Sequence, residues 1–322
     1  MQWSAEQRAA ARAQYEHDGV YVSPQPVIPL DVVSRASAGM EALMRGEYET
    51  GVAPQPSYWN PGDGANKLVK IEMPQACNRA IMDLVSHPAL GELAASLTGA
   101  DMIQVWWVQM LVKPSKAPDG GVGPQVGWHQ DRQYWEVWEE GSELFTAWVA
   151  LTDVTADSGP VRYVRGSQEW GLLNGGDFFA QDLQGQRIAA PAGSSWEEVA
   201  GVLPPGGVSC HHQLTVHGSG ENYSGRQRRS FAIHLRTEKS RPVGNARQGL
   251  AALIDDPAYC PVIYGSRHAD RARSAGSAPG GRASAARALP APRQRRQPHP
   301  PVPMAYHGGV RAREATGWRR AA

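Results

Sequence analysis

Three groups of residues in this chain carry side chains that could bind a metal ion or an anion. The first is Trp128-His129-Gln130-Asp131, where one residue separates an imidazole from a carboxylate. On a β-strand, residues i and i+2 point to the same face, so His129 and Asp131 would enter one cavity. A lone His-x-Asp pair also occurs on surface loops, but the aromatic residues around this one, Trp128, Tyr134, Trp135 and Trp138, indicate a pocket.

The second group is His211, His212 and His217. A histidine from this distant segment would complete a set of two imidazoles and one carboxylate. Such a set binds one side of an octahedral metal and leaves positions open, as in non-haem Fe(II) oxygenases. Taken alone, His217 would equally fit a hydrogen-bonded core histidine.

The third group is Arg226-Gln227-Arg228-Arg229, directly before the apolar segment 231–235. A guanidinium binds a carboxylate through two parallel hydrogen bonds. An arginine near a metal therefore suggests a co-substrate with an acid at its far end. The alternative is a solvated turn, which we expect of Arg226 and of one member of the Arg228/Arg229 pair.

The elements that must position these side chains follow from the apolar pattern. Helices are expected at 4–17, 31–45 and 78–97, with Pro88 interrupting the last. Strands are expected where β-branched and aromatic residues gather, at 20–22, 67–73, 101–112, 126–130, 144–151, 161–164, 206–210, 214–217 and 228–236. Strands linked by turns, with helices near the N-terminal end, predict an α+β fold around a β-sandwich or barrel.

The charge divides the chain into two parts. The formal net charge of the 322 residues is +1, but residues 266–322 hold 12 of the 32 basic residues, all Arg, against only Asp270 and Glu314. The net charge is therefore about +10 in this segment and about −9 in residues 1–265. The apolar pattern stops at Gly265, which predicts a disordered Arg/Ala/Pro-rich tail. A frame change in a GC-rich gene near residue 266 would produce the same composition.

Composition also bounds the compartment. The sequence contains no run of about 18 apolar residues, so no membrane span is predicted. The three cysteines, Cys77, Cys210 and Cys260, are too scattered for a disulfide scaffold. We therefore expect a cytoplasmic protein without a membrane partner.

Three longer stretches together resemble the phytanoyl-CoA dioxygenase family of Fe(II)- and 2-oxoglutarate-dependent oxygenases. They are WHQD at 128–131, FTAWVALTDVTADSGPVRYVRGSQEWG at 145–171 and LPPGGVSCHHQLTVHGSGENYSGRQRRSFAIHL at 203–235, followed by PVIYG at 261–265. Their order and spacing are more specific than any single motif. The resemblance implies a dioxygenase domain at residues 1–265, with a double-stranded β-helix (jelly-roll, cupin-like) core and flanking N-terminal helices.

The resemblance also implies roles for single residues. His129, Asp131 and His217 would be the catalytic iron ligands. Arg228 would bind the distal carboxylate of 2-oxoglutarate, unless a one-residue register shift gives that role to Arg229.

Other positions match the co-substrate site of the family, namely Ser219, Trp148, Gln109 and, more weakly, Lys70. The neighbouring Cys210, His211 and His212 receive no metal role, although His212 could face the pocket. Ser158 and Gln168 depart from the Asn and His that the family has there, and neither position is a ligand.

Asp131 is present where halogenating relatives have Gly or Ala. The resemblance therefore implies hydroxylation of a C–H bond in a small organic substrate, with consumption of O₂, release of succinate and CO₂, and ascorbate as an auxiliary reductant. The loops at 113–127 and 171–202 are expected to act as lids. We expect a monomer or homodimer.

Two alternatives stay open at this point. One is a non-catalytic member of the same fold that binds a metabolite, which the intact His-Asp-His set disfavours. The other is nucleic-acid binding through the positive charge of the tail. The absence of Lys from the tail, and its abundance of Ala, Pro and Gly, disfavour a nucleic-acid partner.

Overall fold

Two antiparallel sheets form the centre of the molecule. The computed structural model describes residues 3–116, 121–186, 188–244 and 249–267. Within these residues the larger sheet has the strand order β1-β8-β5-β10-β3-β11, with β2 also paired to β3, and the smaller sheet has the order β4-β9-β6-β7. The strands are β1 (Val20–Val22), β2 (Val69–Glu72), β3 (Met102–Lys113), β4 (Val126–His129), β5 (Leu144–Ala150), β6 (Arg162–Val164), β7 (Glu198–Ala200), β8 (Val208–His212), β9 (His217–Ser219), β10 (Arg228–Thr237) and β11 (Val262–Gly265).

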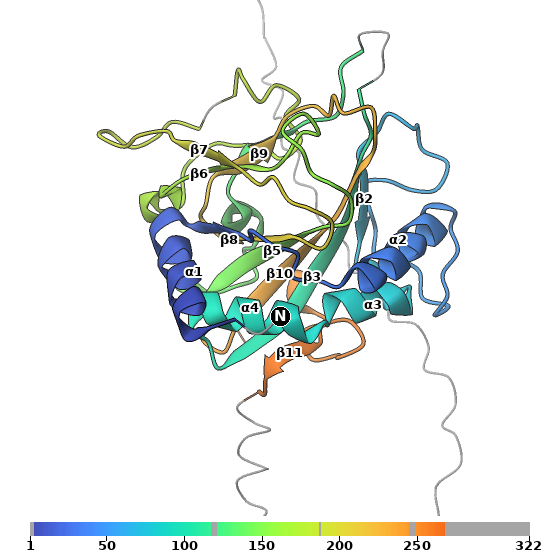
Figure 1. Cartoon of the computed structure of the whole chain (residues 1–322), viewed down its shortest axis with the longest axis horizontal. Coiled ribbons are helices and arrows are strands. Elements are labelled where there is room, and N and C mark those ends of the chain that lie inside the picture. The colour runs from blue at the N-terminus through green and yellow to red at the C-terminus, as the bar shows by residue number, and fades with distance from the viewer. Residues whose placement is uncertain (1–2, 117–120, 187, 245–248, 268–322) are drawn as a thin grey trace, which may run out of the picture.

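The helices lie against one face of the larger sheet, and β6, β7 and β9 lie over its other face (Figure 1). They are α1 (Ala5–Asp18), α2 (Leu30–Met44), α3 (Arg79–Val85) and α4 (Pro88–Thr98), with short 3-10 turns at Pro74–Ala76, Asp131–Tyr134, Ser167–Trp170 and Gly249–Ala251. This arrangement confirms the expected α+β fold with a jelly-roll core and flanking N-terminal helices. In the described part of the chain, no helix is both long and apolar enough to cross a membrane.

β10 lies inside the larger sheet and sorts its side chains by alternation. Phe231 and Leu235 belong to the apolar core that the helices cover. Arg228, Ala232 and His234 line a cavity on the opposite face. Because the side-chain period of a strand is two, one strand supplies both the core and the polar wall of the cavity.

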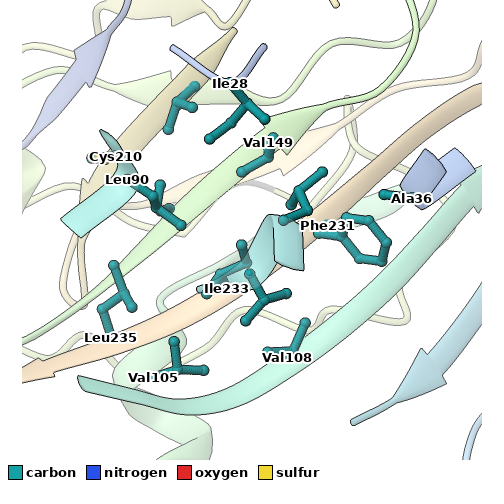
Figure 2. Packing of buried hydrophobic residues seen from close by; sticks show 14 of the residues in the cluster. Ile28, Ala36, Leu90, Val105, Val108, Val149, Cys210, Phe231, Ile233 and Leu235 are labelled. Atoms are coloured by element: carbon teal, nitrogen blue, oxygen red, sulfur yellow. The ribbon is translucent and has the colours of Figure 1, made fainter. Parts of the chain in front are cut away.

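The apolar layer on the helix side joins all the central strands. In Figure 2, Ile233 of β10 lies among Val105 and Val108 of β3 and Val149 of β5. Leu90 of α4 belongs to the same cluster. Each fully buried aliphatic side chain of this kind contributes about 1.5–3 kcal/mol, so the layer stabilises the sheet behind the cavity.

The expected helix at 78–97 is divided at Pro88, as its sequence indicates. The Asn78 side chain accepts a hydrogen bond from the Ile81 backbone N–H at 3.2 Å and caps α3. Pro88 begins α4, where a missing N–H costs nothing. Gly99 ends α4 with a φ of +67°, a conformation that favours glycine.

The strands confirm most of the expected pattern, with two additions. β7 and β11 were not expected. The strand expected at 214–217 begins only at His217, as β9, because residues 213–214 form a turn. β8 begins only at Val208 because Gly206, with a φ of +81°, turns the chain before it. β11 pairs with β3 and ends at Gly265, where the dioxygenase domain is expected to end. Residues 268–322 lie outside the described residues, so the disorder and the origin of the tail stay predictions.

Candidate active site

His129, Asp131 and His217 lie together in the cavity between the sheets. His129 ends β4, His217 begins β9, and the two are paired across these neighbouring strands. Asp131 Oδ1 lies 3.7 Å from His129 Nε2 and 3.7 Å from His217 Nε2. All three side chains are buried, and their ligand atoms lie within 4.8 Å of one another. The sequence prediction that these residues converge is therefore confirmed.

The local structure that brings Asp131 to this point differs from the expected one. β4 ends at His129, and Asp131 opens a 3-10 turn that runs to Tyr134. The two side chains therefore converge because a strand end is followed by a tight turn, and strand alternation is not the cause.

Hydrogen bonds to the backbone fix which imidazole nitrogen faces the carboxylate. His129 Nδ1 lies 2.8 Å from the Gly127 carbonyl oxygen, and His217 Nδ1 lies 2.9 Å from that of Thr215. A carbonyl oxygen only accepts, so each Nδ1 carries the proton. In the neutral ring, Nε2 then carries the lone pair on the side that faces Asp131, which is the form that a metal binds.

The charges of the cluster favour the same form. Burial, reinforced by the nearby imidazoles, holds the pKa of His217 well below its usual range, so this ring is neutral. Burial alone would raise the pKa of the Asp131 carboxyl, but the surrounding imidazoles hold it well below its usual range. Two imidazoles and one carboxylate form a donor set that fits Fe(II).

Thr146, which the sequence did not indicate, and His211, which received no metal role, contact the other carboxylate oxygen. Thr146 Oγ1 donates to Asp131 Oδ2 at 2.7 Å, and His211 Nε2 lies 3.1 Å from the same oxygen. His234 Nδ1 lies 2.8 Å from Thr146 Oγ1 and extends the network. His211, rather than His212, faces the cavity, because adjacent residues of β8 point to opposite faces.

The cavity at Arg228 also adjoins a second buried basic side chain, Lys113, which contacts the lining residue Ser219. Arg228 is 3% exposed and Lys113 is 0% exposed. Within the described residues neither side chain has a carboxylate within 4.0 Å. Arg228 Nη1 donates to the Gly159 carbonyl oxygen, its Nε has no partner, and its guanidinium lies 5.1 Å from the centre of the Trp148 ring.

Lys113 connects this end of the cavity to β9. Its Nζ donates to Ser219 Oγ at 2.6 Å, to the Ser219 carbonyl oxygen at 3.1 Å and to that of Gly220 at 2.6 Å. Burial, reinforced by the charge of Arg228, holds the pKa of Lys113 well below its usual range, and burial lowers the pKa of Arg228 to about 10. An anion bound here would relieve both penalties, which suits the distal carboxylate of 2-oxoglutarate.

The structure places the other predicted site residues as follows. Gln109, Trp148, Ser219 and Arg228 line the cavity together with the three predicted iron ligands. Lys70 is not among the lining residues and forms a buried ion pair with Glu72. Arg229 points to the opposite face of β10 and pairs with Glu41 of α2 at 2.8 Å.

Fold and site together define a jelly-roll protein with a buried His-Asp-His cluster that fits a metal ion, beside a cavity lined by a buried arginine. Residues 15–230 match the model of the family described as phytanoyl-CoA dioxygenase (PhyH). The chain belongs to this family and is an Fe(II)- and 2-oxoglutarate-dependent oxygenase.

One curated relative is L-proline trans-4-hydroxylase from Streptomyces griseoviridis. It is 27% identical over 197 residues, which cover 56% of this chain and 71% of that protein.

Solved structures of similar fold come from nogalamycin biosynthesis. One is the epimerase SnoN, solved in complex with Fe³⁺, α-ketoglutarate and nogalamycin RO. It is 22% identical to this chain with a TM-score of 0.58, and the match covers 79% of this chain and 91% of SnoN. The carbocyclase SnoK is 24% identical to this chain with a TM-score of 0.55, and the match covers 74% of this chain and 86% of SnoK.

Proposed function

We propose that this enzyme hydroxylates a C–H bond of a small organic substrate and couples the reaction to conversion of 2-oxoglutarate into succinate and CO₂. The observation that carries the proposal is the intact donor set. The carboxylate of Asp131 is present, is ionised because its pKa is held well below its usual range, and faces the imidazoles of His129 and His217. A carboxylate at this position occupies a site that a halide would otherwise need.

The proposed ligands of Fe(II) are His129, Asp131 and His217. When bound, iron supplies the activation of O₂ that oxidises both 2-oxoglutarate and the substrate. The three donors would hold the ion from one side, so positions on its other side would stay available for organic ligands. Thr146 and His211 restrain the rotation of the carboxylate, because both contact Oδ2.

The proposed site for 2-oxoglutarate lies between Arg228 and the iron ligands. Arg228 binds the distal carboxylate, and the Ser219 hydroxyl, oriented by Lys113, binds the same group. Trp148 and Gln109 form the walls along the co-substrate. The aromatic Phe178, from the long segment that follows β6, covers the iron side, with its ring 5.2 Å from that of His129. This apolar cover would exclude water from the reacting atoms.

The test is a succinate-release assay with purified protein, Fe(II), ascorbate and a panel of small substrates. Mass spectrometry of the product distinguishes hydroxylation from other oxidations, since hydroxylation adds one oxygen atom. The hydroxylase relative makes small amino acids the first compounds to try. A protein that binds neither Fe(II) nor 2-oxoglutarate would contradict the proposal.

A further inference from the structure

Phe178 lines the cavity and contacts one of the proposed iron ligands. Its ring centre lies 5.2 Å from that of His129, with 73° between the two planes. The side chain is half-buried and belongs to the long segment between β6 and β7. A phenyl ring carries no donor or acceptor atom, so it binds neither the ion nor the carboxylates of 2-oxoglutarate. It presents C–H bonds to the reacting atoms, and the proposed reaction oxidises bonds of this kind.

Hydrogen bonds attach the backbone around Phe178 to strand β4. The Phe178 carbonyl oxygen accepts from the Gly127 N–H at 3.2 Å, and the Asp177 N–H donates to the Trp128 carbonyl oxygen at 3.1 Å. The Phe178 N–H donates to the Tyr134 hydroxyl at 2.9 Å. Both polar groups of the Phe178 backbone are therefore satisfied, and they fix the residue against the strand that carries an iron ligand.

The sequence of β4 permits this close approach. A Cβ atom at position 127 would lie 2.2 Å from the Asp177 carbonyl oxygen and 2.7 Å from Ala180 Cβ, so only glycine fits there. Gly127 precedes the iron ligand His129 by two residues. The contact that positions the Phe178 ring is thus made within two residues of a metal donor.

Other aromatic rings near the donors are placed differently. Trp148 also lines the cavity, but it lies against Arg228, where we propose that 2-oxoglutarate binds. Tyr134 and Tyr163 lie 6.0 and 6.1 Å from the ring of a proposed iron ligand, yet neither is among the described residues that line the cavity. Phe178 is therefore the aromatic ring of the cavity wall that bound 2-oxoglutarate would leave uncovered.

We infer that Phe178 is a site of self-hydroxylation, at which the enzyme converts its own phenylalanine to tyrosine when no main substrate is bound. One oxygen atom of O₂ enters succinate, and the other replaces a ring C–H by C–OH, while 2-oxoglutarate loses CO₂. Two electrons come from 2-oxoglutarate and two from the ring, so O₂ is fully reduced without a further reductant. The para carbon is the expected position, because it is the ring atom farthest from the backbone. This inference rests on the proposed function, since the same chemistry is directed at the chain.

The first experiment incubates the full chain with Fe(II), 2-oxoglutarate and O₂ labelled with heavy oxygen, without a main substrate. Mass spectrometry of peptides locates any oxygen that the chain gains, and the peptide of the variant Phe178→Tyr serves as the standard for mass and retention. We expect Phe178 to gain one labelled oxygen atom as succinate forms. Neither the variant Asp131→Ala nor a sample without 2-oxoglutarate should show this gain.

The outcomes of this experiment separate the inference from the proposed function. The inference is overturned if Phe178 stays unmodified while succinate forms, if oxygen enters other residues instead, or if no succinate forms without a main substrate. An added small molecule that is hydroxylated while Phe178 stays unmodified would leave the proposed function intact. A chain that binds neither Fe(II) nor 2-oxoglutarate would contradict both.

The second experiment tests the placement of the ring without turnover. The variant Phe178→Tyr carries the proposed product from the start, and a phenol oxygen bound to Fe(III) absorbs visible light. Phe179→Tyr is the matched control, because Phe179 packs against Tyr58 with 5.3 Å between ring centres and is not among the described residues that line the cavity. We expect visible absorption with Fe(III) from the first variant only. Equal spectra for the two variants would overturn the inference.

Discussion

The Thr146 hydroxyl donates a hydrogen bond to the carboxylate of Asp131, with 2.7 Å between Oγ1 and Oδ2. The other oxygen, Oδ1, is thereby left to face the two imidazoles at 3.7 Å. Thr146 lies on β5, in the larger sheet, whereas the histidines lie on strands of the smaller sheet. One hydrogen bond thus connects the orientation of the metal donors to the rigid part of the fold.

Thr146→Val should weaken metal binding without unfolding the protein. Valine preserves the shape of the side chain but cannot donate to Oδ2, so the carboxylate can rotate. Loss of such an orienting contact typically costs about 10- to 100-fold in metal affinity. Titration with Fe(II) under anaerobic conditions measures the effect, and Thr146→Ser, which keeps the hydroxyl, should stay close to wild type. Equal affinities for the valine variant and the wild type would contradict the role of Thr146.

His129→Ala and Asp131→Ala should each abolish succinate formation, including the uncoupled formation that occurs without a main substrate. Each change removes one of the three donors, and the metal is then held too weakly for turnover. His17→Ala is a suitable control, because the side chain of His17 is 83% exposed and lies on α1. Residual turnover at wild-type level in either variant would exclude that residue as a ligand.

Arg228→Ala should raise the concentration of 2-oxoglutarate needed for half-maximal rate by roughly 10- to 100-fold, since a charge-assisted bidentate contact is lost. Arg229→Ala is the matched control. Its guanidinium faces α2 and pairs with Glu41, so its loss should cost at most about 1 kcal/mol of stability and leave the co-substrate requirement unchanged. The reverse result would show that the co-substrate binds one residue further along β10.

The protein should lose stability as the pH falls from 6.5 to 4, in part through His212. Burial, with a smaller effect of His211, lowers the pKa of His212 to about 4. Its Nδ1 accepts a hydrogen bond from the Leu214 backbone N–H at 3.2 Å, which requires the neutral ring. In this pH range the unfolded chain binds more protons than the folded one. The free energy of unfolding therefore falls by up to about 1.4 kcal/mol for each pH unit of acidification and one histidine.

Urea unfolding at several pH values measures this effect. His212→Asn keeps a side-chain acceptor but removes the titration, so its stability should depend less steeply on pH than that of the wild type. Identical slopes for the two proteins would exclude a contribution of His212.

Much of this site could be predicted locally. The His-x-Asp motif, the distal histidine and the arginine at the start of β10 are each visible within a few residues of sequence, and the structure brings them to one cavity. The sequence alone leaves open whether Arg228 or Arg229 faces the cavity, and the structure separates them, because Arg228 lines the cavity and Arg229 pairs with Glu41 of α2.

The rest depends on pairings between distant segments. Lys113 stands before a Pro in a polar loop-like stretch, and nothing local indicates that it is buried. Its three acceptors, on Ser219 and Gly220, come from more than 100 residues further along the chain. Thr146 likewise has the composition of an ordinary strand residue, and only the packing of β5 against the turn at Asp131 gives it a partner.

A chain that ends at Arg267 should bind Fe(II) and 2-oxoglutarate as the full chain does, as we propose that residues 1–265 form the dioxygenase domain. Arg267 is kept because its guanidinium contacts Asp255 at 2.6 Å. Circular dichroism and the anaerobic absorption of the metal complex compare the two proteins. A loss of either signal would assign a function to the tail, and the nucleotide sequence of the gene would show whether its reading frame changes near residue 266.

β2 is a four-residue strand that pairs only with β3 in the described part of the larger sheet, off the path that joins the other strands. Lys70 and Glu72 lie on this strand, and Gln109, which lines the cavity, lies opposite Glu72 on β3. This short edge strand is therefore held at the cavity wall by a single neighbour, so whatever displaces β3 also displaces the Lys70–Glu72 pair.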